Sequence, residues 1–324
     1  MSTIPGPRFA PEIERSIFQF AALADFARIP LLQLVARRVN IWLKPLLYRV
    51  LCVSKRGTPS QLPSLITSEA PFLAKSVHYL YLDTTTDLWL SPTQVEALLA
   101  ACTGVTTLVL RNDELSPTYL PLLADMPHLR RLAVSLSTLF RIALHRIDPG
   151  HEIFVNITHL EIRDEIQQQG AMRYGVVNAL SRLPALTHLA VLKPVPVNLD
   201  GLLQSLLLRM ERLEVLVVLW PPNDTGRIFR NEFRDVDGLG PMVGSVILVV
   251  GWYSDDESLK TVEGRSHERA QRLEVESWKR AAKGEEEDYW MRAEKFVGAK
   301  RRGEIPARRY WMDKWVYDVF EPET

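Results

Sequence analysis

Two histidines and a glutamate are the residues of this chain whose types and spacing could support chemistry. His159 and His188 occupy the same position in two copies of a recurring six-residue phrase, and Glu161 lies two residues after the first histidine. If the phrases form neighbouring strands, the two imidazoles lie roughly 5 Å apart, and a zinc ion could bind between them. A catalytic zinc needs three converging protein ligands, which flat parallel strands rarely provide. We therefore favour a solvated ladder of polar side chains, and predict no metal site and no cofactor.

No other catalytic motif is found. The sequence has no Walker loop, no HExxH, no CxxC and no GxSxG. Lys plus Arg equals Asp plus Glu, at 39 each, whereas proteins that grip phosphates usually carry a basic surplus. We therefore expect neither an enzyme nor a nucleic-acid-binding protein.

The low cysteine content and the absence of a targeting pattern indicate the compartment. Cys52 and Cys102 are its only cysteines, too few for a disulfide framework and suited to a reducing compartment. The first residues do not have the pattern of a signal peptide. The longest uncharged stretch, residues 238–254, contains four glycines and a proline and is short for a bilayer span. The sequence thus favours a cytoplasmic or nuclear protein without a membrane partner.

The phrase that carries the histidines reads apolar-x-x-apolar-x-apolar and recurs through the middle of the chain. Its copies start 24 to 30 residues apart, most of them about 28. We predict strands near 77–82, 105–110, 129–134, 157–162, 186–191 and 213–218, with a looser seventh copy near 243–250. The segments between the copies have helical spacing, and Ser91-Pro92 supplies an N-cap and a first-turn proline for one of them.

This alternation predicts an α/β fold in which residues 57–254 form a solenoid of strand–helix units. One strand and one helix in 20 to 29 residues resembles the leucine-rich repeat of the ribonuclease-inhibitor-like class. A single unit cannot bury its apolar face, so neighbours stack with their strands in parallel. A doubly wound α/β domain also alternates strand and helix, but the near-identical strand phrases argue against it.

The third and fifth positions of each phrase are expected to face outward from the strands, on the concave side of the solenoid. We assign target-binding roles there to polar and aromatic side chains: Tyr79, Tyr81, Arg131, His159, Glu161 and His188. In the last two copies the equivalent positions are apolar, as at Val215 and Val217, so another segment should cover them. The open recognition surface is then expected over the first five repeats.

Residues 1–56 do not follow the repeat. They predict a small helical module, with one amphipathic helix from Pro11 to Phe20 and a second from Pro30 to Trp42 that ends before Pro45. The module resembles the F-box-like segment at the head of many fungal F-box/leucine-rich-repeat proteins. The residues that carry this resemblance are Pro11-Glu12-Ile13, Ile17-Phe18, Leu34-Val35-Ala36-Arg37-Arg38, Trp42 and Pro45-Leu46-Leu47-Tyr48-Arg49.

The F-box resemblance implies a partner and a role. Such modules dock on the adaptor subunit of a cullin–RING ubiquitin ligase, and the residues expected to bind it are Pro11, Ile13, Ile17, Phe18, Leu31, Leu34, Val35 and Trp42. The protein is then expected to be a substrate-recognition subunit that binds an unknown target protein and acts by proximity alone. Two alternatives stay open. The apolar residues could simply cap the solenoid, and the chain could be a stand-alone repeat protein with no ubiquitin role.

Residues 255–324 form a charged tail that holds four of the eight tryptophans, and aromatic residues argue against disorder. Acidic residues 285–288 open one helix and basic residues 300–302 close it, as the helix dipole favours. Trp290, Ala293 and Val297 form its apolar stripe. We predict that this helix packs on the apolar end of the solenoid; a partner-binding helix is the alternative.

Overall fold

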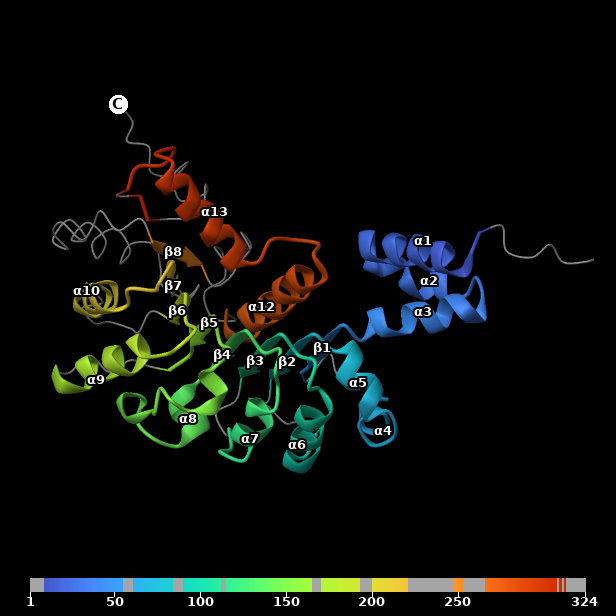
Figure 1. Cartoon of the computed structure of the whole chain (residues 1–324), viewed down its shortest axis with the longest axis horizontal. Helices are drawn as coiled ribbons and strands as arrows, with labels where there is room; N and C mark the ends of the chain where they lie inside the picture. The colour runs from blue at the N-terminus through green and yellow to red at the C-terminus, as the bar shows by residue number, and fades with distance from the viewer. Residues whose placement is uncertain are drawn as a thin grey trace, which may run out of the picture.

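The computed structural model centres on one sheet of eight parallel strands that lie side by side in their order along the sequence. It describes residues 9–54, 61–83, 90–111, 115–164, 170–192, 200–220, 247–252, 266–307, 309, 310 and 312. The strands are β1 (Val50–Val53), β2 (Tyr79–Asp83), β3 (Thr107–Arg111), β4 (Arg131–Val134), β5 (His159–Ile162), β6 (His188–Leu192), β7 (Val215–Trp220) and β8 (Leu248–Trp252). The molecule thus has the predicted α/β character, with a solenoid-like arrangement of its strands (Figure 1).

Equivalent leucines of the repeated phrase line up across the sheet. The paired positions are Leu51, Leu80, Leu108, Leu132, Leu160, Leu189, Leu216 and Leu248. Each is at most 2% exposed. Because side chains alternate along a strand, this leucine row fixes one face of the sheet toward the main core. The residues on either side of each leucine then point to the opposite face.

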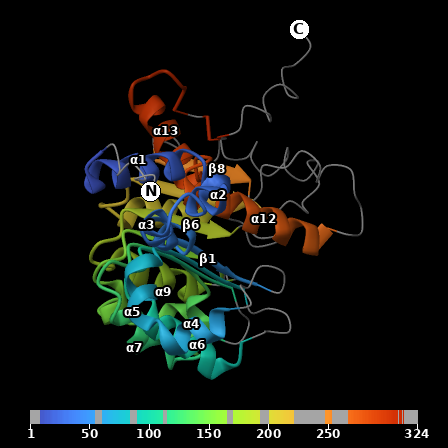
Figure 2. The ribbon, with the colours of Figure 1, turned by 90° about the vertical axis from the view of Figure 1, so that its right-hand side faces the viewer.

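Seven helices cover the leucine face of the sheet, which is the outer side of the arc in Figure 1, and Figure 2 shows the helices named there on the same side. They are α4 (Leu62–Ser68), α5 (Ala70–Ser76), α6 (Pro92–Ala101), α7 (Tyr119–Ala124), α8 (Leu136–Phe140), α9 (Gly170–Ser181) and α10 (Asp200–Arg209). Ser91 caps α6 as expected, in a reciprocal capping box with Gln94. Two short 3-10 turns, Leu144–Arg146 and Glu152–Phe154, lie between α8 and β5. Across the described ranges, no helix combines the length and apolar character needed to cross a membrane.

The two ends of the sheet differ from the sequence prediction. The sheet begins with β1, inside the segment assigned to the N-terminal module, one strand before the first predicted copy. In the seventh copy the predicted alignment is wrong by two residues, since Leu248 and not Val246 pairs with Leu216. A shift of two residues leaves the same side chains on the same face, so the apolar pattern could not distinguish the two registers. Residues 243–246 of that copy lie outside the described residues.

The N-terminal module consists of α1 (Pro11–Ala24), a 3-10 turn (Phe26–Arg28), α2 (Ile29–Gln33) and α3 (Arg37–Leu47). Its own small core is formed by Ala22, Phe26, Ile29, Val39 and Leu43. The predicted second helix, Pro30 to Trp42, is divided in the structure. Ala36 is extended, with φ −161° and ψ 153°, and α3 runs on through Pro45. A proline in the last turn costs the helix little, because it interrupts only one of the final backbone hydrogen bonds.

The module joins the sheet at the β1 end. Lys44 Nζ of α3 lies 2.9 Å from a carboxylate oxygen of Glu69, and the rings of Tyr48 and Phe72 meet edge to face at 5.2 Å. In Figure 1 the module extends beyond the end of the arc. These contacts place the N-terminal module against α5, at the end of the sheet where β1 lies.

Two tail helices, α12 (Ser266–Lys283) and α13 (Tyr289–Arg301), lie on the side of the strands opposite to α4–α10. Both Figure 1 and Figure 2 show this placement. The helix predicted from residues 285–302 is therefore confirmed, with Asp288 as its N-cap and Gly303 beyond its end in a left-handed conformation, φ 75°. Two of the tail tryptophans, Trp311 and Trp315, lie outside the described residues.

Candidate functional site

The inner face of the sheet carries the residues predicted to bind a target, and it is covered. Tyr81 is fully buried, Glu161 and His188 are 6% exposed, and Tyr79, Arg131 and His159 are half-buried. The expectation of an open surface over the first five repeats is therefore wrong. So is the solvated polar ladder proposed for His159, His188 and Glu161. The physical reason is the tail, which follows the whole inner face and not only its apolar end.

Helix α12 covers the first strands. Val275 and Trp278 of this helix pack on Cys52, Tyr81, Val109 and Ala133, and the rings of Tyr81 and Trp278 are 5.3 Å apart. Burial raises the pKa of the Cys52 thiol to about 11, so the thiol stays protonated and unreactive at neutral pH. This end of the inner face is an apolar contact with no evident chemistry.

Helix α13 covers the last strands with its predicted stripe. Four residues of α13 pack on five strand residues and form a second apolar cluster. The helix residues are Trp290, Ala293, Phe296 and Val297, and the strand residues are Ala190, Val215, Val217, Leu219 and Val249. The prediction that a covering segment lies on the apolar repeats is thus confirmed. Lys300, near the end of α13, donates a hydrogen bond to the carbonyl of Leu248 at 3.0 Å, and burial lowers the pKa of this lysine to about 7.

Polar contacts fix the start of α13 over the middle strands. Arg131 of β4 donates to Asp288 at 2.6 Å, and Asp288 also caps α13 by accepting from the Met291 amide at 2.7 Å. The Tyr289 hydroxyl donates to Glu161 at 2.9 Å. Burial and the neighbouring carboxylate hold the Tyr289 pKa well above its usual range, so this phenol remains a donor. Two of the predicted target-binding residues are therefore engaged by the chain's own tail.

His159 and His188 lie between these polar contacts and the apolar cluster. Their rings stack with centroids 4.0 Å apart and planes 13° from parallel, and the edge-to-face ring of Trp290 packs against both. Each Nδ1 lies within hydrogen-bond distance of the hydroxyl of the preceding threonine, at 2.9 Å for Thr158 and 2.8 Å for Thr187. The repeat therefore places both imidazoles in the same orientation.

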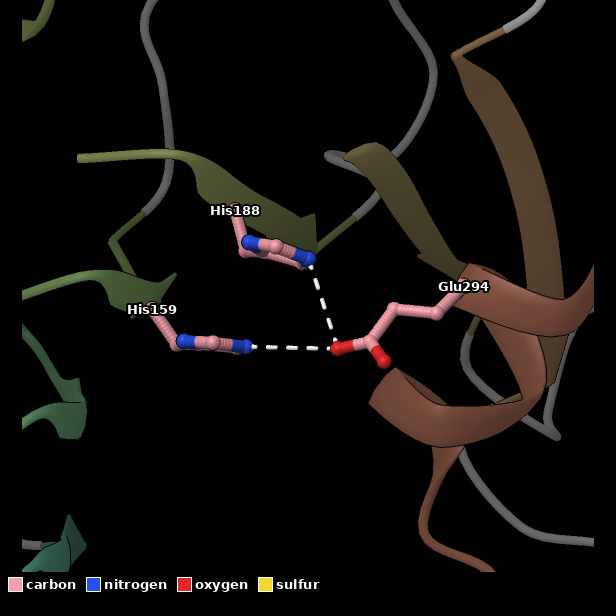
Figure 3. Close-up of side chains that lie close together, drawn as sticks. All are labelled: His159, His188 and Glu294. Atoms are coloured by element: carbon pink, nitrogen blue, oxygen red, sulfur yellow. Dashed lines mark ion pairs between the residues drawn. The ribbon is translucent and has the colours of Figure 1, made fainter. Parts of the chain in front are cut away.

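The Nε2 atoms of both histidines point at one carboxylate oxygen of Glu294, on α13 (Figure 3). The distances to Oε1 are 3.6 Å from His159 and 3.4 Å from His188. Neither Nε2 has a hydrogen-bond partner among the described residues, although both atoms are buried. His159, His188 and Glu294 are thus a group that could hold a metal ion, with ligand atoms all within 4.8 Å of one another.

Both imidazoles are neutral at physiological pH. Burial, with the charges of His188 and Arg131 adding to it, lowers the pKa of His159 to about 3. Burial likewise lowers the pKa of His188 to about 4, while it raises the pKa of Glu294 above its usual value. The contacts drawn in Figure 3 therefore join a carboxyl group to two uncharged rings and are not ordinary salt bridges.

The sequence analysis considered His159 and His188 together with Glu161, rejected a metal site, and did not include Glu294. Glu161 was the neighbour on the strand, but in the structure it accepts from Tyr289 and lies 2.8 Å from Arg163. The actual third group comes from α13, one turn after Trp290. Its place in the sequence, between the stripe residues Ala293 and Val297, indicated that Glu294 would lie near the covered face. The sequence did not indicate on which strands the stripe packs.

The N-terminal module presents a second candidate surface, which is open. Of the residues predicted to bind an adaptor, six are exposed: Pro11, Ile13, Ile17, Leu31, Leu34 and Val35. Phe18 and Trp42 instead pack against the core of the module. The capping alternative is wrong for Ile13, Ile17 and Leu34, which remain 53%, 49% and 81% exposed and so do not close the solenoid.

Further apolar side chains extend this surface beyond the predicted set. Phe20 is 78% exposed, Ile41 63% and Leu23 43%. Phe20 shares a shallow depression on α1 with Ile13 and Ile17. The helical spacing of Ile13, Ile17 and Phe20 was itself the signal that could have included Phe20.

Comparison with protein-family models and with curated protein sequences finds no match for this chain. The class of the protein accordingly follows from its architecture: an α/β chain with a sequentially ordered parallel sheet, a helical N-terminal module and a tail on the inner face of the sheet.

Proposed function

We propose that this protein is a non-catalytic binding scaffold that serves as a substrate-recognition subunit of a cullin–RING ubiquitin ligase. Its strand–helix units are, in this proposal, leucine-rich-repeat-like, and the module of α1–α3 is F-box-like and docks on the adaptor subunit. The observation that carries the proposal is the set of exposed apolar side chains on that module. Contiguous exposed apolar surface of this kind marks protein interaction sites.

The module is built to present this surface without rearrangement. Its core lies beneath α1 and α3, and Arg38 makes a two-pronged contact with Glu14 at 2.9 and 2.7 Å that ties these helices together. Asp25 accepts from the Ala27 amide at the turn between α1 and α2. A preorganised face loses little conformational entropy on binding. This favours docking of the module as a rigid body over docking that requires a rearrangement.

The covered inner face limits how a target can be bound. Tyr81, Glu161 and His188 can reach a target only if α12 and α13 leave the sheet. With the tail in place, a target meets the outward sides of these helices. In either case the protein contributes no covalent step, and raises the effective concentration of its target near the ligase.

Capture of the purified adaptor subunit by the full chain tests this proposal. Ile17→Asp places a charge in the exposed surface and should abolish capture, because a desolvated unpaired charge at an interface is strongly unfavourable. Leu208→Asp is the matched control, since Leu208 is 63% exposed on α10, away from the module. It should bind as the wild type does.

Three outcomes bear on the proposal. Capture that is lost in Ile17→Asp and retained in Leu208→Asp supports adaptor docking. Absence of capture by the wild-type chain, or equal loss in both variants, removes it. The chain would then be assigned as a stand-alone repeat protein with no ubiquitin role.

A further inference from the structure

We propose that His159, His188 and Glu294 form a binding site for one divalent transition-metal ion of the Zn²⁺ type, which ties α13 to strands β5 and β6. The inference is independent of adaptor docking, since the site lies on the inner face and not on the N-terminal module.

The hydrogen bonds of the two threonines are compatible with a tautomer that leaves both Nε2 atoms free. The Thr158 hydroxyl lies 3.3 Å from the carbonyl of Arg130, and the Thr187 hydroxyl lies 3.3 Å from the carbonyl of Thr158. When each hydroxyl donates its single hydrogen to that carbonyl, it accepts from the N–H of the adjacent Nδ1, at 2.9 and 2.8 Å. In this tautomer each Nε2 has a free lone pair.

Three lone pairs consequently converge with no hydrogen between them. Both Nε2 atoms and Glu294 Oε1 are acceptors in these protonation states, and no donor among the described residues reaches either Nε2. The Nε2–Oε1 distances of 3.6 and 3.4 Å are also longer than a hydrogen bond. A buried acceptor without a partner is costly, and a cation at the centre of the group removes this cost at the two Nε2 atoms.

Two of the three ligand–ligand separations fit a zinc-sized ion, and the third, between the two Nε2 atoms, is at most 4.8 Å. Ligand atoms at 2.0 to 2.2 Å from a tetrahedral Zn²⁺ are about 3.3 to 3.6 Å apart, which covers both Nε2–Oε1 distances. The two rings are nearly parallel, so the bound ion would draw their tips together by a small rotation of each side chain. Two imidazoles and one carboxylate suit Zn²⁺ better than Mg²⁺ or Ca²⁺, which prefer oxygen ligands.

The surroundings also suit a metal ion. A metal-binding imidazole usually donates its other N–H to a fixed acceptor, which is the role that Thr158 and Thr187 already fill. Arg131, whose charge acts on both histidines, is paired with Asp288 at 2.6 Å. Glu214 contributes negative charge on the His188 side, while Arg301 opposes it. The Glu294 side chain is 45% exposed, so an ion can reach the site from solvent and a water can complete the coordination.

Metal uptake by the full chain tests the site. Protein stripped with a chelator is given ZnCl₂, passed through gel filtration and analysed for bound zinc, and the affinity is measured by competition against a chromophoric chelator. We expect about one ion per wild-type chain, and at least ~10-fold weaker binding in His188→Gln and in Glu294→Gln. His128→Gln, an exposed histidine on another part of the surface, should bind as the wild type does.

A second pair of variants tests the role of the threonines. Thr187→Val removes the acceptor of the His188 N–H and should weaken zinc binding about 10- to 100-fold, as loss of such outer contacts typically does. Thr106→Val is the matched variant, because Thr106 occupies the same repeat position and donates to the backbone carbonyl of His78 at 3.0 Å. The residue that follows Thr106 is a threonine and not a histidine. Its affinity for zinc should not change.

The result that overturns the proposal is simple to recognise. No zinc above the level of His188→Gln, or uptake that is equal in wild type, His188→Gln and Glu294→Gln, means that these residues do not form a metal site. Should His188→Gln fail to fold by circular dichroism, Glu294→Gln decides, because its partly exposed side chain can be changed without opening the core.

Discussion

The two helical segments that flank the sheet differ in the exposure of their apolar side chains, which is high in the N-terminal module and low in the tail. On α1 and just after α2, Ile13, Phe20 and Leu34 are exposed, and the module meets the rest of the molecule at α5, through Glu69 and Phe72. On α13, Trp290, Phe296 and Val297 are at most 7% exposed and pack on the inner face. Both segments are amphipathic in sequence, so amphipathic character alone does not separate a docking helix from a covering helix.

The difference lies in what the sheet offers to each segment. The last strands carry the apolar side chains of Val215, Val217 and Val249 on the inner face, and α13 covers them. At the other end of the sheet, the N-terminal module meets α5 through Lys44 with Glu69 and Phe72 and through Tyr48 with Phe72. The tail is therefore part of the folded body, whereas the apolar surface of the module remains available to another molecule.

Removal of each segment should give the largest contrast. A chain ending at Ser254 loses α12 and α13, and should lose roughly 5 kcal/mol or more of unfolding free energy, because several large side chains at about 1.5–3 kcal/mol each are no longer buried. Urea unfolding and binding of a hydrophobic dye measure this. Removal of residues 1–47 should leave the sheet's unfolding free energy within about 1 kcal/mol and reduce dye binding. Equal effects of the two truncations would erase the distinction between the segments.

Single aromatic residues should repeat the contrast on a smaller scale. Trp290 is 6% exposed and Phe20 is 78% exposed. Trp290→Ala should cost about 3–5 kcal/mol, as for other buried aromatic residues, whereas Phe20→Ala should change stability by less than about 0.5 kcal/mol. Denaturant midpoints of the two variants provide the measurement. A large cost for Phe20→Ala would show that the module's surface is structural after all.

The polar tether of α13 should give the smallest effect. Asp288→Ala removes both the N-cap and the partner of Arg131, and should cost roughly 1–2 kcal/mol. Asp288→Asn keeps an oxygen for the Met291 amide and loses only the ion pair, so its cost should be about half as large. Thermal melting of the two variants separates the contributions. Identical melting temperatures would mean that the cap adds nothing beyond the charge.

Much of the sheet could be predicted from the sequence, because its signal is local and repeated. The phrase that ends in Leu80 and Leu82 has counterparts in five later strands, and each starts within two residues of the expected position. The last strand was displaced because the alternation of side chains has a period of two and cannot distinguish Val246 from Leu248. The break at Ala36 was missed because it interrupts an otherwise continuous apolar pattern.

The inner face could be predicted only in part, for a different physical reason. Exposure of the His159 and His188 row was inferred from their polarity, yet polar residues can be buried when each finds a partner. Asp288 is such a partner for Arg131 and Tyr289 for Glu161. Both lie far along the chain, as does Glu294, in a segment with no repeat to predict where it packs. Residue type drew attention to the two histidines, and only the packing of the tail brought Glu294 to them.

The sequential order of the strands also has a consequence in time. Each strand pairs with the strand before it and the one after it, so the sheet can grow outward from any pair through contacts that are close in sequence. The tail closes much longer loops, since Tyr289 reaches Glu161 across 128 residues and Asp288 reaches Arg131 across 157. We therefore expect refolding in which the sheet forms first and the tail docks last, so that during synthesis the inner face stays uncovered until α12 and α13 have emerged.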